Sequence, residues 1–140
     1  MPESNHSDRD KALLALVIEE AGKVNSDSNY FVGRTALQKT IYFIKAINVP
    51  MDYEFIMTIL GPCCVQVQRD VEWLQAYEMA SDVSESPFDY SDYIAGSQYE
   101  EFLNEYPEVK QYREQVKRIV TVKIPISRTD GFDEHFGLLL

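Results

Sequence analysis

The chain has 140 residues, of which 45% are hydrophobic and 26% are charged, and its formal net charge is -10. A chain of this length and composition can bury a core as one domain, so wholesale disorder is not expected. Its apolar runs fall short of the roughly 18 residues that a membrane span needs, and its acidic N-terminus lacks the apolar region of a signal peptide. We therefore expect a cytoplasmic protein with no membrane partner.

The charge is divided unevenly along the chain. Residues 1–109 hold 7 Lys and Arg against 19 Asp and Glu, whereas residues 110–128 hold 6 against 1. Because an acidic body repels a polyanion, any contact with nucleic acid would have to be local to this basic C-terminal segment.

The two cysteines, Cys63 and Cys64, are adjacent in the sequence. A disulfide between neighbours is strained, so we expect two reduced core thiols, with a redox pair or metal ligands as the alternative. The imidazole partners on offer, His6 and His135, lie near the termini. We therefore expect neither a metal site nor a cofactor.

The first predicted helix begins at Ser7, because Ser7 and Asp10 have the spacing of a capping box. It ends at Gly22, a residue that tolerates the left-handed conformation of a helix cap. The apolar stripe of this helix comprises Leu13, Leu14, Val17, Ile18 and Ala21.

A second helix is predicted from Gly33 onwards and stops by Pro50. Thr35 and Gln38 also have capping-box spacing, with the glutamine reaching back to the start of the helix. Helical periodicity then separates two stripes on neighbouring faces. The first stripe comprises Leu37, Ile41, Ile44 and Asn48. The second, polar stripe comprises Gln38, Tyr42 and Lys45, with Arg34 at its start, and is either a candidate partner-binding surface or an ordinary solvated face.

Residues 33–43 have the sequence pattern Gly-Arg-Thr-x-Leu-Gln-Lys-x-x-Tyr-Phe, and Gly61-Pro62 follows downstream. This pattern resembles the YwgA-like proteins of bacteria and archaea and, more distantly, the Panacea (SocA-like) antitoxin domain. The resemblance implies a small helical domain with winged-helix-like elements. It also implies importance for Leu37, Gln38, Lys39 and Tyr42, and the Panacea resemblance implies an antitoxin-like or regulatory partner.

Residues 53–59 alternate between apolar and polar side chains, which predicts a strand with at least one well-buried face. Pro62 suits the first position of a third helix, predicted to run to Tyr77. Trp73 and Tyr77 lie one turn apart on that helix and are either partner-binding aromatic side chains or a peripheral core pair. The Ser-, Asp- and Tyr-rich residues 78–96 would suit a short hairpin or an irregular wing.

Towards the C-terminus, the capping-box spacing of Ser97 and Glu100 predicts a short helix, and Pro107 can restart a further helix. That helix directs Val109, Tyr112, Val116 and Ile119 inward. Its outer face is basic, and the candidate nucleic-acid residues are Lys110, Arg113, Lys117 and Arg118. Alternation from Val120 to Ile126 predicts an edge strand, which together with the apolar tail is compatible with a homodimer.

The predicted fold is α+β, mainly helical, and forms one domain over residues 1–140. Residues 7–96 make a winged-helix-like core with a small β-hairpin, residues 97–128 a C-terminal extension of helix and edge strand, and residues 129–140 a tail. The third helix carries only Arg69 against Asp70 and Glu72, which equips it poorly for DNA.

We found no phosphate-binding loop, metal-ligand spacing or nucleophile motif in the sequence. The favoured hypothesis is therefore a non-catalytic protein-interaction module, an antitoxin-like or regulatory adaptor of a prokaryotic system. The alternative is a winged-helix transcriptional regulator that binds DNA through the basic C-terminal segment.

Overall fold

The structure is a computed structural model that describes residues 7–25, 33–84 and 91–122. Its elements, in chain order, are α1 (Asp8–Asn25), α2 (Arg34–Ala46), β1 (Ile56–Thr58), β2 (Gly61–Cys63), α3 (Val65–Ala76), β3 (Ala80–Asp82), β4 (Tyr93–Ala95), α4 (Tyr99–Glu105), the 3-10 helix η1 (Pro107–Tyr112) and α5 (Arg113–Thr121). The strands form two antiparallel pairs, β1 with β2 and β3 with β4.

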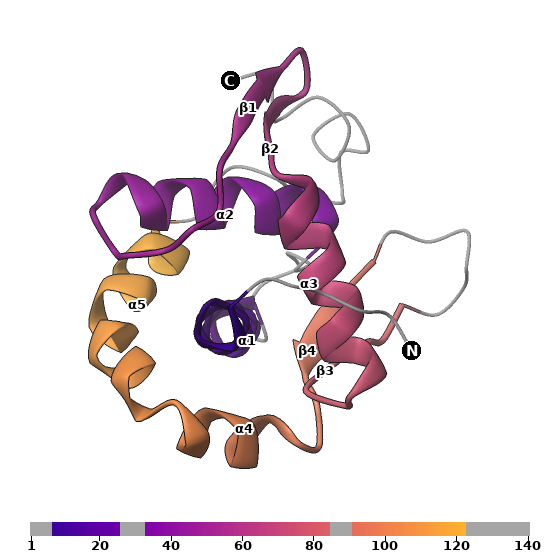
Figure 1. Cartoon of the computed structure of the whole chain (residues 1–140). Helices are drawn as coiled ribbons and strands as arrows, with labels where there is room; N and C mark the ends of the chain where they lie inside the picture. The colour runs from indigo at the N-terminus through magenta and orange to yellow at the C-terminus, as the bar shows by residue number, and fades with distance from the viewer. Residues whose placement is uncertain (1–6, 26–32, 85–90, 123–140) are drawn as a thin grey trace.

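Helix α1 runs through the centre of the molecule and is surrounded by the other elements. Seen along its axis, it lies inside a circle formed by α2, α3, β3–β4, α4 and α5 (Figure 1). Residues 12–18 are seven consecutive apolar residues, and each is at most 1% exposed. A helix that is apolar all round can be buried all round, and this one is. The five predicted stripe residues are all buried, and burial extends to their neighbours on the other sides of the helix. The predicted end at Gly22 is wrong, because the helix continues to Asn25.

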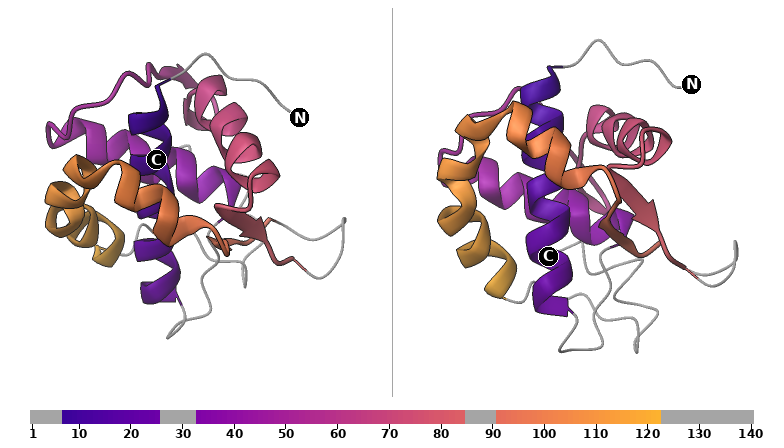
Figure 2. Two further views of the ribbon diagram at one scale, coloured as in Figure 1. Left: turned by 60° about the horizontal axis from the view of Figure 1, so that its bottom comes forward. Right: turned by 90° about the horizontal axis from the view of Figure 1, so that it is seen from below.

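The surrounding helices supply one apolar face each. The predicted stripe of α2 is confirmed at Leu37, Ile41 and Ile44, which are buried, but is wrong at Asn48, which is exposed and follows the end of the helix. Val109 and Val116, from η1 and α5, are also fully buried against the same core. Figure 2 shows how α4, η1 and α5 wrap along the length of α1.

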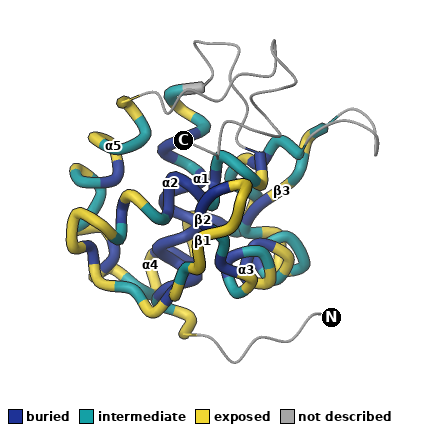
Figure 3. Tube along the Cα trace, turned by 90° about the horizontal axis from the view of Figure 1, so that it is seen from above, coloured by how far each residue is buried: buried dark blue, intermediate teal, exposed yellow. Residues whose placement is uncertain are grey.

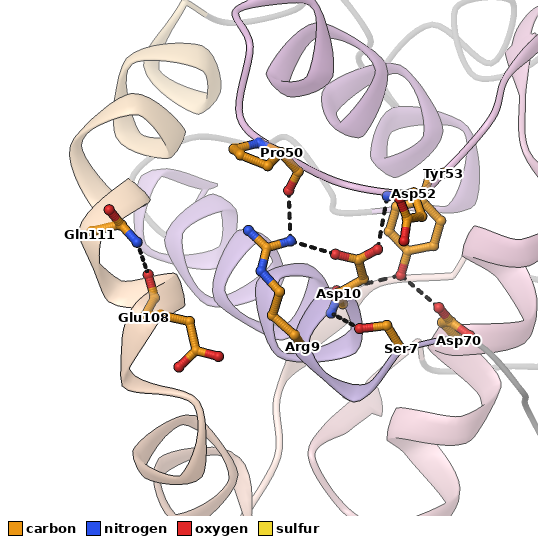
Figure 4. Close-up of polar contacts among 9 residues, drawn as sticks. All are labelled: Ser7, Arg9, Asp10, Pro50, Asp52, Tyr53, Asp70, Glu108 and Gln111. Carbon is orange, nitrogen blue, oxygen red and sulfur yellow. Dashed lines mark hydrogen bonds and ion pairs between the residues drawn. The ribbon is translucent and has the colours of Figure 1, made fainter.

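Two charged residues, Asp10 and Lys11, are buried at the N-terminal end of α1. The Asp10 carboxylate accepts hydrogen bonds from Arg9 at 2.7 Å and from the backbone N–H of Asp52 at 2.9 Å. Arg9 also donates to the Pro50 carbonyl at 2.7 Å (Figure 4). These contacts attach the segment that follows α2 to the start of α1. The predicted cap at Ser7 is confirmed in part: its hydroxyl accepts from the Asp10 N–H at 3.4 Å.

Tyr53 connects the same segment to α3. Its hydroxyl donates to the Asp70 carboxylate at 2.7 Å, and Gln66 donates to the other Asp70 oxygen at 2.8 Å. Tyr53 and Asp70 are fully buried. Burial, followed by the negative charge of Asp70, raises the pKa of the Tyr53 phenol well above its ordinary value. The phenol therefore remains a proton donor to Asp70 over the physiological range.

A second cluster of charges lies near the C-terminal end of α1, where α5 packs. Arg113 pairs with Glu19 at 3.2 Å and with the buried Glu20, and Lys23 pairs with Glu19 and Glu20 at 3.1 and 3.0 Å. Burial alone would raise the pKa of Glu19, but its bonds to Lys23 and Arg113 outweigh burial and lower it. The prediction that Arg113 shares an outer basic face is therefore wrong.

Three local predictions about helix ends and strands are also wrong in whole or in part. Neither α2 nor α4 has a side-chain cap; α2 begins after Gly33 and α4 after Gln98. Pro62 lies in β2, and α3 begins three residues later at Val65. The predicted buried face of the 53–59 segment is confirmed at Tyr53 but not in the strand itself, because all three residues of β1 are exposed.

Helices α2 and α3 end in the same way, with a residue other than glycine in the left-handed conformation. Asn48 has φ 73° and Glu78 has φ 64°. After α3, the N–H of Met79 bonds the Leu74 carbonyl and that of Glu78 bonds the Gln75 carbonyl, which is the Schellman pattern. Because neither residue is glycine, this signal was missing from the sequence.

The mainly helical α+β fold class is confirmed. The predicted hairpin within residues 78–96 is confirmed as β3–β4. The order of elements before it is the predicted one except for β2, a strand that the sequence did not predict. However, β1 pairs with β2 rather than joining β3–β4, so no winged three-stranded sheet forms among the described residues.

The C-terminal predictions are only partly tested. The predicted restart at Pro107 is confirmed, as 3-10 helix η1 followed by α5. The edge strand is wrong at its start, because α5 continues through Thr121; residues 123–126 and the tail, 129–140, lie outside the described residues. Within the described ranges, no helix is both long enough and apolar enough to cross a bilayer.

Replacing Arg113 by methionine should destabilise the fold by roughly 1–3 kcal/mol, because the buried Glu20 then keeps only Lys23 as a charged partner. The matched change Lys117→Met removes an exposed cation from the same helix and should cost less than about 0.5 kcal/mol. Urea unfolding measures both free energies. Equal losses would contradict a stabilising pairing of Arg113 with the buried Glu20.

Candidate docking site on the β1–β2 hairpin

The β1–β2 hairpin projects from the body and has a two-residue turn at Ile59 and Leu60. The paired residues are Ile56 with Cys63, Met57 with Pro62, and Thr58 with Gly61. The Thr58 hydroxyl donates to the Gly61 carbonyl at 2.8 Å and accepts from the Leu60 N–H at 3.1 Å. Gly61 has φ 112°, which side-chain-bearing residues rarely adopt. The turn is therefore held by its own side chain and by a glycine.

The tip and one strand of this hairpin expose large apolar side chains. Ile56 is 66% exposed, Met57 67% and Ile59 80%, and Leu60 is also exposed. Figure 3 shows the exposed residues along this hairpin. Because successive residues of a strand point to opposite faces, exposure of all of β1 leaves both of its faces uncovered. We call the side chains of Ile56, Met57, Ile59 and Leu60 the apolar tip.

Turn positions of a two-residue hairpin usually hold Gly, Asn or Asp. Here they hold isoleucine and leucine, which favour neither the turn nor contact with water. The run from Phe55 to Gln68 also contains no Asp, Glu, Lys, Arg or His, although 26% of the chain is charged. Sequence reasoning missed the apolar tip, and this uncharged run is the signal that could have found it.

The predicted polar stripe of α2 lies at the base of the hairpin. The Gln38 amide donates to the Cys64 carbonyl at 2.9 Å and accepts from the Cys64 N–H at 2.9 Å. The Tyr42 ring packs edge-on against Phe55, with ring centres 5.6 Å apart. Lys45 donates to the carbonyl of Tyr53. Gln38, Tyr42 and Lys45 therefore share a face, and that face contacts the residues that lead into and out of the hairpin.

Two further residues of the family-like motif, Leu37 and Lys39, are buried, and burial lowers the pKa of the Lys39 ammonium. Phe43, in contrast, is 38% exposed. Arg34 lies apart from the hairpin base, where its Nε donates to the Tyr93 hydroxyl at 3.4 Å.

Trp73 and Tyr77 belong to a separate row of aromatic rings that joins α3 to α4. The Trp73 ring lies 4.6 Å from Tyr77 and 5.7 Å from Phe102, and Phe102 lies 5.4 Å from Tyr106. The Lys11 ammonium is 4.4 Å from the centre of the Trp73 ring. Trp73 thus has the contacts of a peripheral core residue, whereas Tyr77 is 41% exposed.

The candidate nucleic-acid residues do not form one cationic face. Lys110, Lys117 and Arg118 are exposed, whereas Arg113 is directed to α1 by its ion pairs with Glu19 and Glu20. Lys110 also donates to Asn104 at 2.8 Å.

The two cysteines are not joined by a disulfide; Cys64 is buried in the core, as predicted, whereas Cys63 is only half-buried. Within the part of the chain that the structure describes, no cluster of three His, Cys, Asp or Glu residues could hold a metal ion. Both histidines lie outside the described residues.

Comparison with models of known protein families and with curated proteins returned no match. The resemblance to the YwgA-like and Panacea families therefore remains a prediction.

Gln38→Glu should destabilise the fold by roughly 1–3 kcal/mol, because a carboxylate can still accept from the Cys64 N–H but repels the Cys64 carbonyl. The control is Gln111→Glu, where an exposed amide donates to the Glu108 carbonyl at 2.8 Å and solvent replaces the lost bond. Urea unfolding of the two variants compares them directly. Similar losses would show that Gln38 does not hold the hairpin base.

Proposed function

We propose that this protein is a non-catalytic interaction module that docks a protein partner on the apolar tip of the β1–β2 hairpin. The observation that carries the proposal is Ile59, which is 80% exposed on a turn that Thr58 holds in place. Contiguous exposed apolar side chains of this kind mark interaction sites on soluble proteins.

The hairpin is also suited to binding because contacts with α2 already hold both of its ends in place in the absence of a partner. Gln38 bonds the backbone after β2, and Tyr42 packs on the residue before β1. Association costs less conformational entropy when the docking element is already held in its bound shape. The residues of the predicted polar stripe would then act on the partner indirectly, by positioning the hairpin.

Charge supports a protein partner over the other macromolecules. The first 109 residues carry 19 acidic against 7 basic side chains, which disfavours nucleic acid and anionic lipid surfaces. The run that bears the apolar tip contains no cation that could pair with a phosphate. For the DNA-binding alternative, three of the four candidate cations, Lys110, Lys117 and Arg118, are exposed. The fourth, Arg113, pairs with carboxylates of α1.

The resemblance to the Panacea domain adds a narrower proposal, in which the partner is a toxin or another regulatory protein of a prokaryotic cytoplasm. Tyr77, which is exposed beside Trp73, and the exposed Arg34 would then be secondary contacts. The central contact remains the apolar tip, because among the described residues it holds two neighbouring pairs of exposed large apolar side chains, Ile56 with Met57 and Ile59 with Leu60.

A photo-crosslinking amino acid placed at position 59 of the full chain, expressed at native level in its own host, tests this function. We expect irradiation to give a discrete protein adduct from position 59, and none from the control position 121, which is exposed at the end of α5. Adducts of the same masses from both positions, or capture of nucleic acid or lipid by position 59, would overturn the proposal.

A further inference from the structure

The two edges of the β1–β2 hairpin differ in their capacity to pair with another strand. β2 contains Pro62, which cannot donate to a ladder, and Pro on a strand blunts its edge. β1 contains neither Pro, Gly nor charge, and among the described residues its outer edge has no neighbouring strand. An uncharged apolar edge without such devices is a template for pairing with another chain.

The register shows which backbone groups this edge offers. A two-residue turn is flanked by a hydrogen-bonded pair, here Thr58 with Gly61, and hydrogen-bonded and non-hydrogen-bonded pairs then alternate. Met57 with Pro62 is therefore a non-hydrogen-bonded pair, which agrees with the missing N–H of proline. The N–H and C=O of Met57 consequently point to the outer edge of the hairpin.

We propose that the occupant of this site is a second copy of the chain, so that two β1 strands pair antiparallel about a two-fold axis at Met57. This inference rests on the proposed function and names its partner. Met57 faces Met57 of the other copy, and the two residues exchange both hydrogen bonds across the axis. Ile56 then lies opposite Thr58, and the two hairpins form one four-stranded sheet.

The distribution of charge along the chain favours contact between two copies through the hairpin. Each copy carries a net charge of -10, so the bodies repel each other, whereas residues 55–68 carry no charge at all. Contact through this run brings together the part of each copy that carries no charge of its own. Salt screens the repulsion, and the dimer therefore tightens as ionic strength rises. A heterologous partner with a basic rim would show the opposite dependence.

The apolar area indicates a weak dimer. Burial of one large aliphatic side chain removes about 60–120 Å² from water. The four side chains of the apolar tip thus account for roughly 500–1,000 Å² over both copies, which lies below the about 1,200 Å² of standard stable interfaces. The association is expected in a concentration range that sedimentation can resolve.

Sedimentation equilibrium of the purified full chain tests the proposal, with loading concentrations up to several hundred micromolar at about 0.05 and 0.5 M NaCl. We expect a reversible monomer–dimer equilibrium that is tighter at high salt. Met57→Lys places two like charges opposite each other across the axis and should weaken the dimer at least about tenfold. The control Val122→Lys adds the same charge at an exposed apolar residue of α5 and should leave it unchanged.

Mixing Met57→Lys with Met57→Glu distinguishes lost pairing from a damaged fold. The mixture should associate more tightly than either variant alone, because opposite charges then face each other. A wild-type chain that remains monomeric throughout, equal effects of the substitutions at 57 and 122, or no rescue in the mixture would overturn the second copy as the occupant. If position 59 still crosslinks to a different protein, only this inference fails; if it crosslinks to no protein, the proposed function fails as well.

Discussion

The rest of the structure depends on the burial of the middle of α1 on all of its sides. Its middle is apolar on every side, but its ends carry Asp10, Lys11 and Glu20 at 1% exposure. A buried charge is tolerated only when it is paired or hydrogen-bonded. Some partners lie on α1 itself, and others come from the surrounding elements: Asp52 supplies a backbone N–H at one end, and Arg113 supplies a guanidinium at the other. The central helix thereby determines where the segment after α2 and the start of α5 can lie.

The position of the hairpin follows from the same constraint. Asp10 holds Asp52, and Tyr53 is inserted between α1 and Asp70 of α3, so the chain leaves the core immediately before β1. Immediately after β2, the side chain of Gln38 binds the backbone of Cys64 and so attaches the chain to α2 again. Both ends of the hairpin are therefore attached to the body by buried or half-buried polar contacts. Only the apolar tip between them projects into solvent, which is the geometry of a docking element.

The sequence predicts those features that are local and periodic. The apolar stripe of α2 and the inward residues Val109 and Val116 are examples, because helical periodicity alone specifies them. Capping-box spacing at Gln38 indicates a side chain able to bond backbone, but not that the backbone of Cys64 offers a better partner than its own helix. The pairing of Arg113 with Glu20 spans 93 residues, a separation that no local pattern encodes. The candidate site was predicted only at its base, since a strand pattern does not show that both faces of β1 are uncovered.

The central claim is that the fold presents the apolar tip as a rigid element rather than as a mobile loop. Backbone ¹⁵N relaxation of the dilute monomer, read at residues 56–63, tests this most directly. The account predicts order parameters close to those of the helices, about 0.85, because Thr58, Gly61 and Gln38 hold the hairpin. Values below about 0.6 at these residues, beside rigid helices, would contradict it.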